Sequence, residues 1–166
     1  MGEPRKRLTR MRYGSGPMGF LADQIMKEMQ RAGYTPREFN LYRSPDEQEK
    51  MRDRRVSQVG PYCSAHQYYA ASDIICERFA WFASDQAPPG APFWDCLWDC
   101  AVLVGEKYNV EFSERLPWDA AHVQLANWKQ FKEVVGREKP NQTQLDWYFQ
   151  VTLPQVWKQY QKRKVR

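Results

Sequence analysis

The 166-residue chain has only two histidines and four cysteines, and it has no long apolar run. A membrane-spanning helix needs about 20 consecutive apolar residues, so we expect no membrane span. The basic start is not followed by the apolar core of a signal peptide. We therefore expect the chain to be made in the cytoplasm.

The four cysteines do not have the paired spacing of a structural zinc site. Cys63, Cys76, Cys96 and Cys100 form no Cys-x-x-Cys pairs. Without a secretory signal, we predict that all four are reduced and structural. Cys63 is close to His66 in the sequence, but packing remains its simpler role.

The net charge of +5 is concentrated at the two ends. Basic ends can contact anionic wall polymers or nucleic acid. No nucleic-acid-binding module accompanies them, so we predict solvated tails and no nucleic-acid partner. The length fits one domain with a core of its own, and we expect a monomer.

The first part of the chain predicts a basic arm followed by a helix. We predict that residues 1–16 form a flexible basic arm that ends in glycine and serine. Residues 17–31 are expected to be helical, because apolar residues recur on one face, at Leu21, Ile25 and Met29. Gly33 is expected to end this helix.

The next segment predicts a short strand and a capped helix. Residues 39–43 alternate in the manner of a strand. Ser44 and Glu47 form a capping box around Pro45, so a helix is predicted from Pro45 to about residue 54.

Further strands and one more helix follow. Strands are predicted at 74–82, 110–112 and 123–125, and a helix at 93–107. Together these elements predict an α+β domain over residues 17–125, a small antiparallel sheet with helices around it. Residues 126–166 predict a helical, aromatic-rich extension packed on the main domain. Its aromatic side chains suit core packing or a partner-docking surface.

Each histidine has an aspartate nearby. His66 precedes Asp73 by seven positions, and Asp119 precedes His122 by three. A catalytic zinc site has three protein ligands and one position open to water. His66, Asp73 and His122 supply three ligands, and Asp119 is left as a carboxylate able to move protons. Taken singly, each histidine has an ordinary structural explanation, and each aspartate fits a turn or a cap.

These motifs in this order resemble the VanY-like family of zinc peptidases. The family contains D-alanyl-D-alanine carboxypeptidases and L-alanyl-D-glutamate endopeptidases, many of them phage endolysins. The resemblance runs from about Leu21 to Leu125. It implies that His66, Asp73 and His122 bind zinc and that Asp119 is the general base.

Two further residues match the family pattern. The Tyr-Arg-Ser segment with Arg43, followed by Glu47-Gln48, resembles the family's upstream motif. Arg43 would then orient the substrate and stabilise the developing oxyanion. Ser64 matches the motif serine; we place it at the substrate site, supporting the ligands by hydrogen bonding and not as a nucleophile.

One departure from the family pattern lies next to the first histidine. The family usually has a glycine three residues after that histidine, and this chain has Tyr69. Tyrosine adds bulk where a close backbone contact is usual, so we expect an altered local shape with all three ligands kept.

The resemblance implies a peptidase that cleaves peptidoglycan stem peptides at the cell wall, after release by a separate lysis system. Endolysin-type endopeptidase is the first expectation and D,D-carboxypeptidase the second. The alternative is a non-catalytic virion or wall-binding relative that keeps the fold and the metal. A His₂Asp site is also compatible with divalent ions other than zinc.

Overall fold

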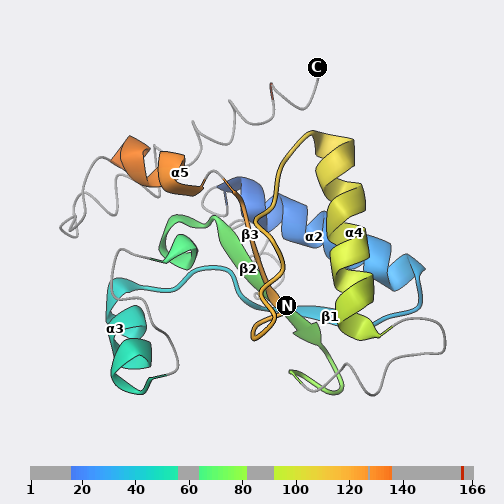
Figure 1. Ribbon diagram of the computed structural model, residues 1–166, viewed down its shortest axis with the longest axis horizontal. Helices are drawn as coiled ribbons and strands as arrows, with labels where there is room; N and C mark the ends of the chain where they lie inside the picture. Colours follow the sequence, from blue (N-terminus) through green and yellow to red (C-terminus); the bar gives the residue numbers. More distant parts are fainter. Residues whose placement is uncertain (1–15, 56–63, 82–91, 127, 136–161, 163–166) are drawn as a thin grey trace, which may run out of the picture.

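The computed structural model shows an α+β protein in which a three-stranded antiparallel sheet packs against helices (Figure 1). The α+β class predicted from the sequence is confirmed. The structure describes residues 16–55, 64–81, 92–126, 128–135 and 162. The predicted arm lies outside this part of the chain except for Gly16, and so do Cys63 and most of the 126–166 extension. Among the described residues, no helix is long and apolar enough to cross a membrane.

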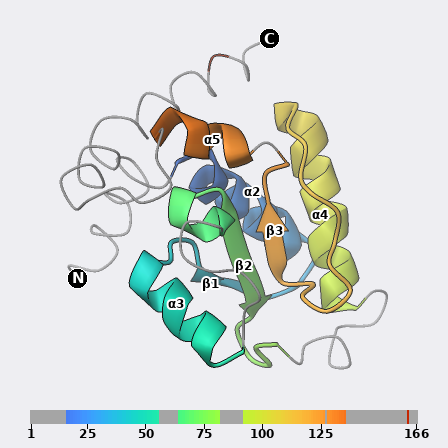
Figure 2. The same ribbon diagram turned by 60° about the vertical axis from the view of Figure 1, so that its left-hand side comes forward.

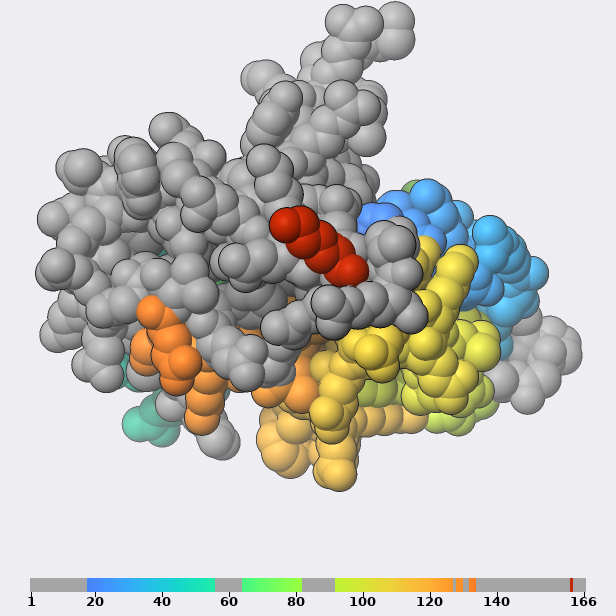
Figure 3. All heavy atoms as spheres, turned by 90° about the horizontal axis from the view of Figure 1, so that it is seen from above, coloured from blue at the N-terminus to red at the C-terminus, as the bar shows by residue number. Residues whose placement is uncertain are grey.

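Two long helices form a large part of the apolar core. Helix α2 spans Gly16–Arg31 and helix α4 spans Phe93–Tyr108, within one residue of the predicted bounds. They pack against each other, as Figures 1 and 3 show. The residues between them are buried and spaced by three or four, among them Met18, Leu21, Ile25, Met29, Leu97, Ala101 and Val104.

Helix α2 ends as its sequence predicts. Gly33 has φ of +94°, a left-handed conformation that costs glycine little. The N–H of Gly33 then donates to Gln30 O, and that of Tyr34 donates to Met29 O at 3.0 Å. This Schellman arrangement satisfies the last helical carbonyls and directs the chain into the sheet.

The sheet has the order β1-β2-β3, with β2 in the centre. Strand β1 spans Pro36–Asn40, β2 spans Ala71–Cys76 and β3 spans His122–Gln124. Every residue of β2 is buried, because helix α2 packs on the sheet and neighbouring strands flank β2 on both sides.

The strands were predicted less well than the helices. The expected strand at 39–43 is β1, displaced to 36–40, and that at 74–82 is β2, displaced to 71–76. After Cys76 the chain turns and returns to pair with that residue at Ala80. The expected strands at 110–112 and 123–125 reduce to β3 and a single bridge between Phe112 and Leu125.

Three short helices complete the described chain (Figure 2). Helix α3 spans Pro45–Asp53 and begins with the predicted capping box: Ser44 Oγ accepts from the Glu47 N–H, and the Glu47 carboxylate accepts from the Ser44 N–H. The 3₁₀ helix η1 spans Ala65–Tyr68 and precedes β2. Helix α5, Trp128–Val135, packs against η1, so the start of the C-terminal extension lies on the main domain.

The cysteines of the described chain are free and buried, as predicted. They are Cys76, Cys96 and Cys100. Cys96 and Cys100 lie one turn apart on α4 with their sulfurs at 3.9 Å. Both thiols therefore pack as small apolar groups in the core.

Candidate metal centre

The sheet places Asp73 directly beside His122. Asp73 on β2 is the cross-strand partner of His122 on β3 and of Asn40 on β1. Directly opposed residues in a sheet project their side chains from the same face. The register therefore places two polar side chains, Asn40 and His122, beside the carboxylate of Asp73, a residue that is only 4% exposed.

A bulge in β1 aims Asn40 at this carboxylate. Glu38 pairs with Ile74 and Asn40 with Asp73, which leaves Phe39 as the extra residue. A bulge locally re-aims the side chains of its strand. Asn40 Nδ2 donates to Asp73 Oδ2 at 3.3 Å, whereas Phe39 is exposed and contacts Trp81.

His66 approaches from η1, the short helix before β2. Ser64 caps this helix, because its Oγ accepts a hydrogen bond from the His66 N–H at 3.3 Å. The His66 ring is 1% exposed, and its Nε2 lies 3.3 Å from Asp73 Oδ2. Ser64 thus makes a hydrogen bond to the backbone of a predicted ligand, and its role at the substrate site stays a prediction.

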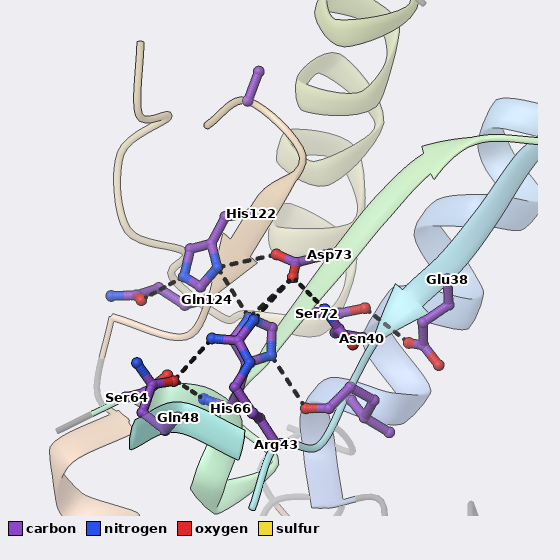
Figure 4. A network of polar contacts seen from close by, with 12 residues as sticks. Glu38, Asn40, Arg43, Gln48, Ser64, His66, Ser72, Asp73, His122 and Gln124 are labelled. Atoms are coloured by element: carbon purple, nitrogen blue, oxygen red, sulfur yellow. Dashed lines mark hydrogen bonds and ion pairs between the residues drawn. The ribbon is translucent and has the colours of Figure 1, made fainter. Parts of the chain in front are cut away.

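Three donor atoms converge at the centre of this arrangement (Figure 4). His66 Nε2 lies 3.2 Å from His122 Nδ1, and His122 Nδ1 lies 3.2 Å from Asp73 Oδ1. One donor atom from each of His66, Asp73 and His122 lies within 4.8 Å of the others. The predicted ligands are thus brought together, and the group could hold a metal ion.

The outer nitrogens of both imidazoles have acceptors. His66 Nδ1 lies 3.3 Å from the carbonyl oxygen of Leu41, and His122 Nε2 lies 2.8 Å from Gln124 Oε1. A carbonyl oxygen only accepts hydrogen bonds, so each outer nitrogen must carry the proton and donate it. In a neutral ring the inner nitrogen then presents its lone pair to the centre.

This arrangement fits a cation. Two inward lone pairs 3.2 Å apart, beside a carboxylate, repel one another unless a proton or a metal ion lies between them. Neutral imidazoles held by outer acceptors are the usual form of histidine metal ligands. The donor set, two nitrogens and one carboxylate oxygen, suits several divalent metal ions, zinc among them.

The electrostatics of the pocket also favour a positive charge. Burial opposes ionisation of Asp73, but hydrogen bonds from His122 and His66 outweigh it and hold the pKa of Asp73 well below its usual value. Burial likewise opposes protonation of His122, but the hydrogen bond and negative charge of Asp73, the hydrogen bond to Gln124 and the charge of Asp119 together raise the pKa of His122. A buried, ionised carboxylate therefore faces the two rings and attracts a cation.

Arg43 lies at the edge of the three-donor group. Its Nη1 donates to Gln48 Oε1 at 2.9 Å, and its Nη2 lies 3.7 Å from Asp73 Oδ2. Its backbone N–H donates to the carbonyl of His66. Only 11% of the Arg43 side chain is exposed, so helix α3, through Gln48, and strand β2 hold its charge in a fixed position.

Asp119 lies in the turn that leads into β3. Its N–H donates to Leu116 O, and its own carbonyl accepts from the His122 N–H. The side chain is half-buried. Burial and then the negative charge of Asp73 raise the pKa of Asp119, against the attraction of the two histidines and Arg43. The charges of the site therefore affect the pKa of Asp119, although Asp119 is not part of the three-donor group.

Tyr69 stands where the resembling family usually has glycine, and its backbone conformation is one that glycine adopts easily. Its φ is 54° and its ψ 33°, in the left-handed region where it ends η1 and turns the chain toward β2. Glycine adopts this conformation with little strain, and tyrosine does not. The buried Tyr69 ring stacks on Tyr42, with centroids 4.9 Å apart. The bulk of the side chain is thus accommodated, and the strain lies in the backbone.

Sequence reasoning missed the side chains that hold the ligands. Gln124 could have been found, because it follows His122 by two positions in an expected strand and so shares its face. Gln48 was noted only as part of a motif, and its burial was not foreseen. Asn40 carried no signal, since its position depends on the bulge in β1.

Comparison with known proteins does not assign the chain to a family. No protein-family model, no curated protein and no solved structure matches it. The function must therefore be inferred from the chemistry of the site.

Proposed function

We propose that this chain is a zinc-dependent peptidase that hydrolyses the stem peptides of bacterial peptidoglycan. The observation that carries the proposal is the convergence of His66 Nε2, His122 Nδ1 and the Asp73 carboxylate, with both imidazoles hydrogen-bonded on their outer sides. This donor set leaves one tetrahedral position for water or substrate, as in a catalytic zinc site.

Each of the other site residues has a role in that reaction. Zinc, when bound, would lower the pKa of a water molecule and polarise the scissile carbonyl. Asp119 accepts the proton of the attacking water and delivers it to the departing amine, a role suited to a half-buried carboxylate with a raised pKa. Arg43, fixed by Gln48, offers its charge to the oxyanion that forms on the carbonyl.

The choice of substrate rests on the resemblance of the motifs to the VanY-like peptidases. In that family the same order of arginine, histidine, aspartate, aspartate and histidine acts on D-amino-acid-containing wall peptides. An L-alanyl-D-glutamate endopeptidase of the endolysin type is our first assignment and a D,D-carboxypeptidase the second. The net charge of +5 would assist contact with anionic wall polymers.

The decisive experiment combines metal analysis with digestion of purified peptidoglycan. The zinc-loaded chain should contain about one zinc and release stem-peptide fragments, and mass spectrometry of these fragments names the bond that is cleaved. If the zinc-loaded chain releases no fragment, the peptidase proposal is wrong and a wall-binding role is favoured.

The variant Asp119→Ala distinguishes a role of Asp119 as general base from a role as zinc ligand. We expect this variant to keep its zinc and to lose about 10²–10⁴-fold in turnover, the usual contribution of a general acid–base. Glu114→Ala is the matched control, because Glu114 is an exposed acidic residue in the same segment and should have no effect. Unchanged turnover in Asp119→Ala would remove Asp119 from the mechanism.

A further inference from the structure

Gln124 makes a specific pair of hydrogen bonds beside the metal centre. It follows His122 by two positions on β3, so both side chains leave the same face of the strand. Gln124 Oε1 lies 2.8 Å from His122 Nε2 (Figure 4). Gln124 Nε2 donates to Ser113 Oγ at 3.2 Å. Gln124 is therefore a link between His122 and Ser113.

Ser113 is itself held in place by the backbone. Its N–H donates to the carbonyl of Gln124 at 2.9 Å, next to the bridge between Phe112 and Leu125. The Ser113 hydroxyl is thus kept beside the amide of Gln124. In the structure the NH₂ group of Gln124 points to Ser113 and its carbonyl oxygen faces His122.

This orientation decides which nitrogen of His122 carries the proton. The carbonyl oxygen of Gln124 can only accept, so His122 must present an N–H at Nε2 and a lone pair at Nδ1. Nδ1 is the atom that faces His66 and Asp73. Without an acceptor at Gln124, the ring could place its proton on Nδ1 and direct it at Asp73.

The other histidine is oriented differently. His66 Nδ1 faces the backbone carbonyl of Leu41, an acceptor that no substitution of a side chain removes. Of the two ligand imidazoles, only that of His122 depends on a side chain for its outer hydrogen bond. Gln124 is thus the point at which a single substitution can alter the orientation of a ligand without removing it.

We propose that Gln124, held by Ser113, is a positioning residue that fixes His122 as an Nδ1 ligand and thereby sets the metal affinity of the site. The inference rests on the metal binding of the proposed function and is independent of the peptidase reaction. Loss of such an outer partner typically weakens metal binding by about 10–100-fold.

The test is a zinc titration of the full chain against a chromophoric chelator, with three variants. Gln124→Leu removes the acceptor and should weaken zinc binding about 10–100-fold. Gln124→Glu keeps an acceptor and should bind zinc at least as tightly as the wild-type chain. Ser113→Ala leaves the amide unanchored and should give a smaller loss than Gln124→Leu.

Gln24→Leu is the matched control. Gln24 on α2 is also half-buried, and its Oε1 accepts a hydrogen bond from Tyr108 at 3.2 Å. The substitution removes a comparable glutamine hydrogen bond distant in sequence from the ligands, and it should leave zinc affinity unchanged. Equal losses in Gln24→Leu and Gln124→Leu would show a general effect on stability and overturn the proposal.

A spectroscopic measurement tests the orientation directly. In ¹⁵N–¹H spectra of the zinc-loaded chain, His122 should carry its proton on Nε2 in the wild-type chain and in Gln124→Glu. In Gln124→Leu the Nε2–H signal should shift or broaden as its acceptor is lost, and the visible spectrum of the cobalt-substituted chain should change.

The outcomes separate this inference from the proposed metal site. If the wild-type chain binds no zinc, the site itself is wrong. If the wild-type chain binds zinc and Gln124→Leu binds it equally well, the site stands and the role of Gln124 is wrong. If Gln124→Leu does not fold, Ser113→Ala and Gln124→Glu decide: wild-type affinity in Ser113→Ala together with weakened binding in Gln124→Glu overturns the proposal.

Discussion

Two regions are buried: the helix layer of α2 and α4, and the polar pocket, by which we mean His66, Asp73, His122 and Arg43. Burial lowers the free energy of the folded state in the first region and raises it in the second. In the helix layer, side chains such as Leu21 and Leu97 are fully buried, and each contributes about 1.5–3 kcal/mol by leaving water. In the pocket, His66 and Asp73 are buried just as deeply. Burying a carboxylate costs free energy that its partners only partly return.

This difference in burial energy indicates that the helix layer contributes mainly to stability, whereas the buried polar residues fit the proposed function. Replacing a whole buried ionic group by apolar residues is often neutral or stabilising, whereas removing Asp73 alone would leave Arg43 and the two histidines without their carboxylate. The presence of two histidines, an aspartate and an arginine together in the interior therefore agrees with the proposed metal site. We expect substitutions in the two regions to give separable effects.

The largest effect is expected from His122→Ala in the pocket. This change removes one of three donors, so zinc affinity should fall by more than the 10–100-fold that accompanies loss of an outer partner. Equilibrium competition with a chelator measures the loss. A variant that keeps one tightly bound zinc per chain would remove His122 from the ligand set.

The matching test of the helix layer is Leu97→Ala, which should affect stability and not zinc binding. A cavity in a packed core lowers the free energy of unfolding by about 2–5 kcal/mol, and the folded chain should keep its zinc affinity. Urea denaturation with and without zinc measures both. Val102→Ala on the exposed face of the same helix is the control, since Val102 is 56% exposed. A parallel loss of zinc affinity in Leu97→Ala would mean that the two regions are not separable.

A smaller effect is expected at Tyr69, where the two regions meet. Both Tyr69→Gly and Tyr69→Ala lose the ring that stacks on Tyr42, but only alanine keeps a Cβ in the left-handed conformation. The glycine variant should therefore be more stable than the alanine variant by about 1–2 kcal/mol. Thermal denaturation of both variants checks the sign, and a more stable alanine variant would contradict the backbone strain.

The smallest effect concerns the thiols of α4. Burial, with Cys96 next to it, raises the pKa of Cys100 to about 12. Cys100 of the folded chain should therefore resist alkylation near pH 8, where the same thiol in an unfolded chain reacts. An unfolded thiol loses its proton at its ordinary pKa, while the folded Cys100 thiol keeps it to about 12. This thiol therefore stabilises the fold less as the pH rises above 9. Mass spectrometry of peptides locates the alkylated residue, and rapid alkylation of Cys100 itself in the native chain would show that α4 opens locally.

The sequence predicted the helices well because their signals are local. The spacing of Leu21, Ile25 and Met29 defines α2, and Ser44 with Glu47 defines the start of α3. Both are patterns within a few residues, and neither depends on what the helix packs against.

The strands were misplaced because pairing, not composition, sets their limits. The run at 74–82 is rich in strand-forming residues, but the partner strands β1 and β3 extend only along 71–76. The predicted ligands could be named from motifs that are local in the sequence. The residues that hydrogen-bond to them could not, because their positions depend on strand pairing. Asn40 reaches Asp73 only because of the bulge in β1. Leu41 contributes its backbone carbonyl oxygen, which every residue type has, so the sequence gives no signal for it.

The cross-strand alignment of Asn40, Asp73 and His122 has a consequence for how the molecule keeps its shape. A slip of one residue in either pairing would turn His122 or Asn40 to the opposite face, so only the native register assembles the site. A metal ion that binds this register and not the unfolded chain would stabilise it by about 2.7 kcal/mol at a concentration 100 times its dissociation constant. The ion would thus connect η1, β2 and β3, and a chelator would destabilise the sheet as well as prevent the proposed hydrolysis.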